Sequence, residues 1–172
     1  MFMFKLKVYN KMMVTEYKVL EKEVTNWLRD LEKYNQDPLW AKYDKNEWSI
    51  GQMYAYLIQW GSKDFINGIK TCDSSHTKGK TLKGRMTFFS GELKAKDKLF
   101  TKVSSERQSI VELKDGLIRL LKTIDELPDH EHKGKSEHSV YGYLTHKEWV
   151  KLAVIYFKTL SKKKEAVNKH LM

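Results

Sequence analysis

Apolar residues recur at every third or fourth position through four long stretches of this chain, a spacing that places them on one side of an α-helix. The first stretch extends from about Met13 to Tyr34, and its apolar positions are Tyr17, Leu20, Val24, Trp27, Leu28 and Leu31. The second extends from Ser49 to about Lys70, and its apolar positions are Ile50, Met53, Tyr54, Leu57, Ile58, Phe65 and Ile69. Both stretches are predicted to form helices with one buried face.

The other two periodic stretches lie further along the chain. The third helix is expected to begin at residue 104 or 105 and to end at Leu127, where a proline follows. Its apolar stripe comprises Ile110, Leu113, Leu117, Leu120, Leu121 and Ile124. The fourth helix is expected from Thr145 to about Asn168. Its inner face comprises Trp149, Leu152, Ala153, Tyr156, Leu160 and Val167.

Capping residues mark the beginning of two of these helices. Ser49 is followed three positions later by Gln52, and Thr145 is followed by Glu148 in the same way. This spacing is that of a capping box, in which the side chains and backbone N–H groups of the two residues pair reciprocally. The second and fourth helices are therefore predicted to start at these positions.

The second helix contains three glycines, Gly51, Gly61 and Gly68. Glycine in a helix interior costs about 1 kcal/mol relative to alanine. Three of them in one helix indicate that a neighbouring element packs closely against the backbone, or that the helix bends.

Three segments remain outside the predicted helices: an N-terminal arm at 1–11, a connection at 71–103 and a loop at 129–144. None of them shows the alternating pattern of a β-strand. The pattern therefore predicts an all-α fold in a single domain over residues 1–172, and the long connection fits a crossover between the second and third helices of a bundle.

Composition narrows the class of protein. The chain has 172 residues, of which 41% are hydrophobic and 31% are charged, as in a soluble globular protein. It has no stretch near the roughly 20 apolar residues of a membrane-spanning helix, so no membrane partner is expected. The single cysteine, Cys72, excludes an internal disulfide and favours a cytoplasmic location.

The formal net charge is +10, and part of the excess lies between residues 78 and 102. The basic residues of this segment are Lys78, Lys80, Lys83, Arg85, Lys94, Lys96, Lys98 and Lys102, against Glu92 and Asp97. Interleaved phenylalanines give the segment the composition of a nucleic-acid surface. Arginine is scarce, however, and scattered lysines are more often a solvated surface, so nucleic acid is not the favoured partner.

Histidines occur together in the predicted loop 129–144. Asp129-His130-Glu131-His132 has residue types that bind zinc, but no third ligand is evident nearby, and a solvated polar loop is the simpler interpretation. His138 is expected to make a hydrogen bond that fixes the turn leading into the fourth helix.

Two segments resemble the motifs of a known family. The first is Trp48-Ser49-Ile50-Gly51-Gln52-Met53-Tyr54-Ala55-Tyr56-Leu57, and the second runs from His138-Ser139-Val140-Tyr141-Gly142-Tyr143 to Trp149. At this separation they resemble the DinB-like family of bacterial four-helix bundles. The resemblance implies an up-down-down-up bundle with a long crossover between helices two and three.

Metal-binding members of that family hold a divalent ion with three histidines, one from helix two and two from helix four at positions i and i+4. In this sequence those positions fall at Tyr56, Tyr156 and Leu160, or at Thr159 if the register shifts by one. None is a histidine, and tyrosines with pKa values near 10 are poor zinc or nickel ligands at neutral pH. The resemblance thus implies a degenerate metal site, with neither metal nor cofactor.

Two interpretations of these positions remain open. The residues fill the former site as part of the core, or they line a pocket in which Tyr56 and Tyr156, with Gln52, Trp60 and His138, orient a polar small molecule. The leading functional hypothesis is a metal-free, small-molecule-binding or stress-associated bundle.

Two further functions are alternatives to this hypothesis. One is a thiol-dependent transferase-like enzyme that uses Tyr56 or Tyr156 as an acid in the same pocket. The other is polyanion binding through the basic segment 78–102. Family members often form dimers, and Trp40 and Tyr43, expected to be exposed, suggest a homodimer interface.

Overall fold

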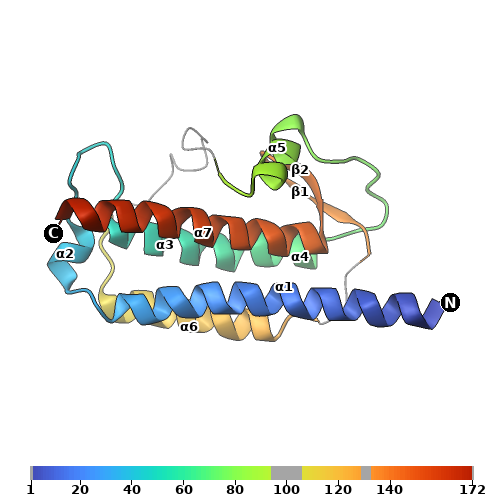
Figure 1. The fold of residues 1–172 in the computed structure, drawn as a ribbon, viewed down its shortest axis with the longest axis horizontal. Helices are drawn as coiled ribbons and strands as arrows, with labels where there is room; N and C mark the ends of the chain where they lie inside the picture. The colour runs from blue at the N-terminus through green and yellow to red at the C-terminus, as the bar shows by residue number, and fades with distance from the viewer. Residues whose placement is uncertain (1, 94–105, 129–132, 172) are drawn as a thin grey trace.

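The computed structural model describes residues 2–93, 106–128 and 133–171 of the chain. This part is mainly helical and contains one small two-stranded sheet (Figure 1). Within the described ranges, no helix combines the length and the apolar character that crossing a membrane requires.

Helix α1 spans Phe2–Leu31, and the short helix α2 spans Gln36–Trp40. The expected N-terminal arm is therefore helical from Phe2 onward, and the start predicted near Met13 was wrong. No proline or glycine occurs in residues 1–34, so nothing in the local sequence stops the helix from extending.

The second predicted helix is one continuous rod made of α3 (Ile50–Trp60), a π-helical turn η1 (Gly61–Phe65) and α4 (Ile66–Lys70). Its capping box is confirmed, because Gln52 N–H donates to the Ser49 hydroxyl and Ser49 N–H donates to the Gln52 side chain. The π-helical turn is the irregularity that the glycines suggested, and it begins at Gly61.

The glycines of this rod also permit close packing. A Cβ atom added at Gly51 would lie 2.6 Å from the Trp40 ring, and one added at Gly68 would lie 2.4 Å from the Trp149 ring. The prediction that other elements approach this backbone closely is confirmed.

Helix α6 spans Ile110–Asp125 and begins with a capping box between Ser109 and Glu112. The predicted start at residue 104 or 105 was wrong, because Ser109 provides the cap; residues 94–105 lie outside the described part. Helix α7 spans His146–Leu171. Its predicted capping box is confirmed by hydrogen bonds between Thr145 and Glu148 in both directions.

The four long helical segments pack in a ring. Helix α1 contacts α6 and α7, and α3 contacts the same two helices. Helices α1 and α7 run in one direction, whereas α3–α4 and α6 run in the other (Figure 1). The predicted apolar stripes meet inside this ring, where Leu20, Leu57, Leu117 and Leu152 are each at most 1% exposed.

Two further elements lie beside one end of α7 (Figure 1). Helix α5 (Leu82–Ser90) occurs within the connection predicted to be a loop. Strands β1 (Lys135–His138) and β2 (Gly142–Thr145) form an antiparallel hairpin in which His138 pairs with Gly142. The expectation of no strand was wrong, because four-residue strands are too short for an alternating pattern to be evident.

The residues suggested for a dimer interface differ from expectation. Trp40 is 6% exposed, and its indole N–H donates to the Gln108 carbonyl oxygen at 3.0 Å. Tyr43 is exposed, as expected, and its ring stacks on His170. Of the two residues suggested for a homodimer interface, only Tyr43 is therefore exposed.

Candidate functional site

Tyr56 and Tyr156, two of the positions that the resemblance aligns with metal ligands, belong to a stack of aromatic rings. Tyr56 of α3 lies over Tyr156 of α7, with ring centroids 6.1 Å apart and planes inclined by 11°. The Trp60 ring stacks on the Tyr156 ring, and the two ring centroids are 4.0 Å apart. Trp48 lies 5.2 Å from Tyr56. The structure thus brings together three of the sequence-predicted residues, Tyr56, Trp60 and Tyr156.

Burial determines the chemistry of this stack. Tyr156 is fully buried, and burial raises the pKa of its hydroxyl far above the ordinary value; the nearby Tyr56 and Tyr141 hydroxyls raise it further. Tyr156 therefore stays protonated at physiological pH and is a poor metal ligand. The buried indole N–H of Trp60 makes no hydrogen bond within the described residues.

The remaining predicted residues have structural partners. Leu160 is 1% exposed and belongs to the hydrophobic core. Thr159 accepts a hydrogen bond from Leu93 N–H at 3.3 Å. Gln52 uses its side-chain oxygen in the capping box of α3. Each of these three side chains therefore has a structural contact of its own.

His138 fixes the hairpin turn, as predicted. Its Nδ1 accepts hydrogen bonds from Val140 N–H at 3.1 Å and Tyr141 N–H at 3.3 Å. The side chain also stacks on the Tyr141 ring, with centroids 4.6 Å apart. Burial lowers the pKa of His138 to about 4, so the imidazole is neutral at physiological pH with its proton on Nε2.

The donor set for a metal ion is poor. Among the residues that the structure describes, no group of three or more His, Cys, Asp or Glu side chains is arranged to hold one. His130 and His132, with their acidic neighbours, lie outside the described residues.

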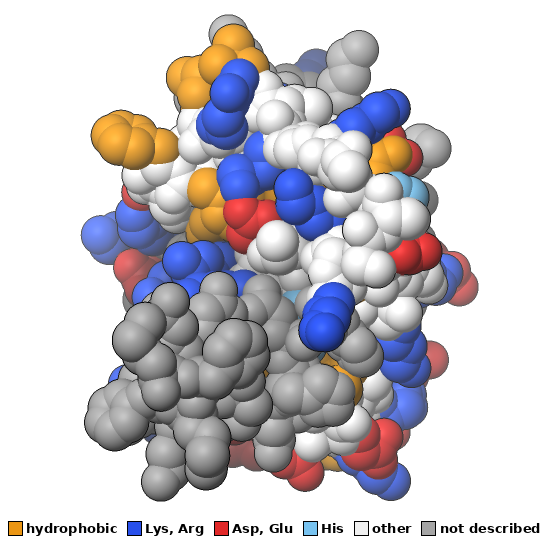
Figure 2. All heavy atoms as spheres, turned by 90° about the vertical axis from the view of Figure 1, so that its right-hand side faces the viewer, with side chains coloured by type: hydrophobic (Ala, Val, Ile, Leu, Met, Phe, Trp, Pro, Cys, Tyr) orange, Lys and Arg blue, Asp and Glu red, His pale blue; other side chains and the backbone are white. Residues whose placement is uncertain are grey.

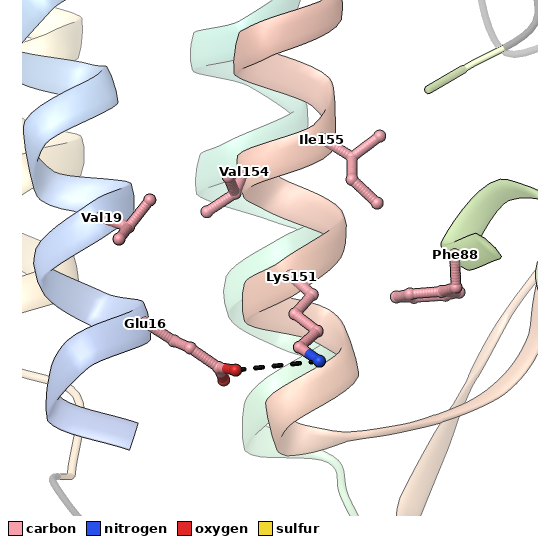
Figure 3. A pocket seen from close by; sticks show the side chains of 6 residues that line it. All are labelled: Glu16, Val19, Phe88, Lys151, Val154 and Ile155. Atoms are coloured by element: carbon pink, nitrogen blue, oxygen red, sulfur yellow. Dashed lines mark ion pairs between the residues drawn. The ribbon is translucent and has the colours of Figure 1, made fainter. Parts of the chain in front are cut away.

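A groove of about 250 Å³ lies between α1, α5 and α7, and none of the stacked residues Tyr56, Trp60 and Tyr156 lines it. In Figure 3, Val19 of α1 faces Val154 of α7. Phe88 of α5 faces Ile155, which also belongs to α7. The two remaining lining residues, Glu16 and Lys151, form an ion pair. The sequence did not reveal this groove, because it requires α5, which was predicted to be a loop.

The charged end of the groove carries an excess of positive charge. Glu16 Oε1 lies 3.6 Å from Lys147 Nζ and 3.9 Å from Lys151 Nζ. Two ammonium groups thus share one carboxylate, while the walls are apolar. Such a site favours a molecule with an apolar body and an anionic group.

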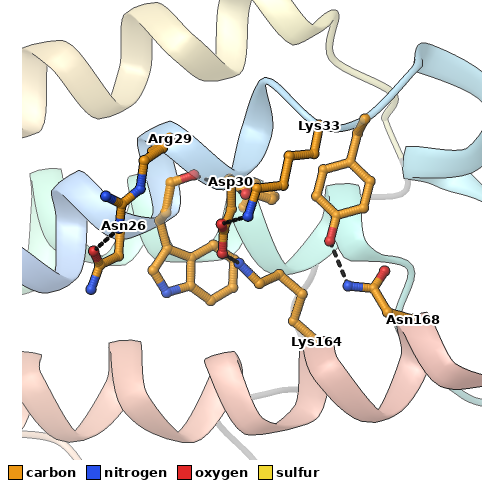
Figure 4. A network of polar contacts seen from close by, with 9 residues as sticks. Asn26, Arg29, Asp30, Lys33, Lys164 and Asn168 are labelled. Atoms are coloured by element: carbon orange, nitrogen blue, oxygen red, sulfur yellow. Dashed lines mark hydrogen bonds and ion pairs between the residues drawn. The ribbon is translucent and has the colours of Figure 1, made fainter.

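A second polar cluster joins α1 to α7 near their other ends (Figure 4). Asp30 accepts hydrogen bonds from Lys33 at 2.7 Å and from Lys164 at 2.9 Å. Lys164 is 4% exposed, and its ammonium lies 4.1 Å from the centre of the Trp27 ring. Burial lowers the pKa of Lys164 and the Asp30 carboxylate partly offsets this effect.

The partners of Lys164 indicate a structural role. Burial favours a higher pKa for Asp30, but hydrogen bonds and charges from Lys33 and Lys164 outweigh burial and hold this pKa below its ordinary value. Because the Asp30 carboxylate and the Trp27 ring both engage the ammonium, Lys164 acts as a link between the two helices.

Comparison with known proteins adds no relative. No family model matches the chain, and neither a curated protein nor a solved structure matches it.

Proposed function

We propose that this chain is a divergent DinB-like helical bundle that binds an anionic, largely apolar small molecule without a metal ion. The observation that carries the binding proposal is a groove with apolar walls and a charged end, where Glu16 and Lys151 line the groove and Lys147 pairs with the same glutamate. The apolar wall residues are Val19, Phe88, Val154 and Ile155. Apolar walls with a few placed polar groups are the usual composition of a small-molecule site.

The bundle assignment is supported by helix order and direction. Helices α1 and α7 run opposite to α3–α4 and α6, which is the up-down-down-up order implied by the resemblance. The segment from α4 to α6 supplies the long crossover, and both motif segments lie at helix beginnings, at the caps Ser49 and Thr145.

The aromatic stack supports a metal-free protein rather than the transferase alternative. A general acid works best with a pKa near the operating pH, whereas burial raises the pKa of Tyr156 far above it. Leu160 has no donor atom, and the stacked rings of Tyr56, Tyr156 and Trp60 occupy the inter-helix space. The core-filling interpretation therefore accounts best for these positions.

The charged end and the apolar walls determine the class of ligand. A carboxylate or sulfate on the ligand gains from the two ammonium groups, whose charge one glutamate balances only in part. Val19, Val154, Ile155 and the Phe88 ring then cover an aliphatic or aromatic body. Medium-chain fatty acids have this chemistry.

Isothermal titration calorimetry with decanoate, below its micelle-forming concentration, tests the proposal. Wild-type protein is expected to bind one decanoate. Lys151→Glu should weaken binding by about tenfold, because it makes the charged end acidic. Val154→Phe should weaken binding by filling the groove while keeping the site's charge.

Lys158→Glu is the matched control, because Lys158 is an exposed lysine on the same helix that does not line the groove. It changes the net charge by the same amount as Lys151→Glu and should leave decanoate binding unchanged. Equal weakening by both charge reversals, or no binding by folded wild-type protein, would overturn the proposal.

A further inference from the structure

Helix α5 presents three of its four large apolar side chains to solvent, whereas the fourth, Phe88, lines the groove beside α7. Leu82, Met86 and Phe89 are 67%, 47% and 95% exposed. Their spacing of four and three residues places them on one face of the helix. The buried positions are Gly84 and Thr87. A helix that only covered the fold would show the opposite arrangement, so this face needs an explanation.

Specific contacts hold α5 in this orientation. The Thr81 hydroxyl caps the helix and donates to the Val140 carbonyl oxygen at 3.0 Å, and Thr81 N–H donates to the Tyr141 carbonyl oxygen at 2.9 Å. A Cβ atom at Gly84 would lie 2.3 Å from that same Tyr141 oxygen. The small face is thus fitted to the hairpin turn, and the apolar face is directed outward by packing.

The surroundings of the apolar face are basic. Lys83 and Arg85 are exposed on α5 itself, and no acidic residue occurs in the sequence between Asp73 and Glu92. Lys80, just before the helix, pairs with Glu148. Figure 2 shows hydrophobic side chains projecting at the upper edge of this end of the molecule, with lysine and arginine side chains beside them.

We infer that the outer face of α5 attaches the protein to an anionic lipid surface. Leu82, Met86 and Phe89 would enter the boundary between headgroups and acyl chains, and Lys83 and Arg85 would contact the anionic headgroups. This combination of apolar and basic side chains is typical of helices that lie in a membrane interface. Attachment of this kind needs no membrane-spanning segment, so it agrees with the helices observed.

Charge complementarity favours a lipid surface over a second copy of the chain. Two α5 faces brought together would oppose their own Lys83 and Arg85 side chains, within molecules of net charge +10. A nucleic acid would meet the basic residues, but exposed Leu82 and Met86 offer nothing to phosphates or base edges. An anionic bilayer satisfies the apolar and the basic side chains together.

Vesicle co-sedimentation tests this inference with the full chain. Wild-type protein is expected to sediment with vesicles of equal parts phosphatidylcholine and phosphatidylglycerol, and much less with phosphatidylcholine alone. The triple variant Leu82→Ser/Met86→Ser/Phe89→Ser should lose about tenfold in affinity or more, because three interfacial apolar groups are removed. Lys83→Gln/Arg85→Gln should lose a similar factor at low salt and less at high salt.

The control variant Val111→Ser/Ile118→Ser removes apolar side chains that are 67% and 45% exposed on α6. It should bind vesicles like the wild type. All variants are checked for folding by circular dichroism and thermal unfolding. The α5 triple variant keeps Phe88, so it should also keep decanoate binding, which separates this inference from the proposed ligand groove.

Several outcomes would overturn the inference. Folded wild-type protein that does not sediment with the mixed vesicles excludes an anionic lipid surface. Equal binding to both vesicle types excludes the role of the basic residues, and undiminished binding by the α5 triple variant places the contact elsewhere. A dimer in sedimentation equilibrium that the triple variant abolishes, without vesicle binding, would identify a second copy as the partner.

Discussion

Burial favours the neutral form of two ionisable side chains, Tyr156 and His138. The Tyr156 hydroxyl is fully enclosed, and its pKa is raised by that enclosure. The His138 imidazole accepts two backbone hydrogen bonds through Nδ1, and burial lowers its pKa to about 4. His138 thus fixes the hairpin turn through hydrogen bonds, and Tyr156 packs within the aromatic stack.

His138 makes stability depend on pH in a defined window. Its pKa is about 4 in the folded chain against an ordinary value of 6.5, so between these values the unfolded chain binds more protons. The free energy of unfolding should therefore fall as the pH drops from 6.5 toward 4, by up to about 1.4 kcal/mol per pH unit. His138→Asn, whose Oδ1 also accepts a hydrogen bond, should reduce this slope in urea unfolding.

His76→Asn is the control for this measurement, since His76 is exposed. It should leave the slope near that of the wild type. A His138→Asn variant with an unchanged slope would show that other groups cause the pH dependence.

Restoring histidines tests the alignment with the DinB-like metal positions. The variant Tyr56→His/Tyr156→His/Leu160→His places one imidazole on α3 and two on α7 at i and i+4, which is a set that binds zinc. The folded variant should bind one zinc ion, as measured by elemental analysis after dialysis, whereas Tyr56→His alone should not. A folded triple variant without zinc would argue against this register.

At the scale of elements, both close packing at glycines and polar pairs join the helices. Gly68 of α4 lies against the Trp149 ring of α7, whose indole N–H donates to the Ser136 hydroxyl at 2.7 Å. Helix α4, the β1–β2 hairpin and α7 thus meet around Gly68. The Asp30–Lys164 pair links α1 to α7 toward the other end.

Gly68→Ala should destabilise the fold although alanine is the better helix former. The added Cβ would lie 2.4 Å from the buried Trp149 ring, which must shift. Overpacking of this kind costs about 1–3 kcal/mol. Gly79→Ala is the matched control, because a Cβ there meets nothing within 4 Å. Equal unfolding free energies for the two variants in urea would contradict the packing argument.

Removing one partner of the Asp30–Lys164 pair should cost more than removing both. Asp30→Asn leaves the buried Lys164 ammonium without its carboxylate, and a cost of about 2 kcal/mol is expected, below the range for fully buried pairs because Asp30 is partly exposed. Asp30→Asn/Lys164→Met should recover much of that loss. A double-mutant cycle of urea unfolding measures the coupling, and purely additive losses would show that the pair is unimportant.

At the scale of the whole molecule, charge and shape point to different partners. The net charge of +10 attracts any polyanion. The outer face of α5 and the groove also favour partners that carry apolar groups. Part of the basic segment 78–102 lies outside the described residues, and within the described part Lys80 pairs with Glu148.

We therefore expect only weak and nonspecific nucleic-acid binding. A mixed-sequence single-stranded oligonucleotide should bind at low salt, and its affinity should fall steeply with salt, as a charge-driven contact requires. Leu82→Ser/Met86→Ser/Phe89→Ser should leave this affinity unchanged in fluorescence anisotropy. Tight binding that persists at high salt would instead support a nucleic-acid function.

The sequence was informative wherever one residue's environment is set by its own helix. The stripes containing Leu20, Leu57 and Leu152 identified buried faces correctly, and the caps at Ser49 and Thr145 marked helix beginnings. These features depend on contacts within a few residues along the chain, which periodicity and capping patterns record directly.

The tertiary structure alone decided the features that join distant segments. Helix α5 has a weak pattern of its own, and it is held by contacts with the hairpin turn around Tyr141, more than fifty residues away. The groove needs α1, α5 and α7 together, and the burial that sets the pKa values of His138 and Tyr156 comes from all the elements packed around them. Sequence determined which residues face inward, because helical spacing is local; packing determined where the site lies, because a site is made by segments that meet only in the folded chain.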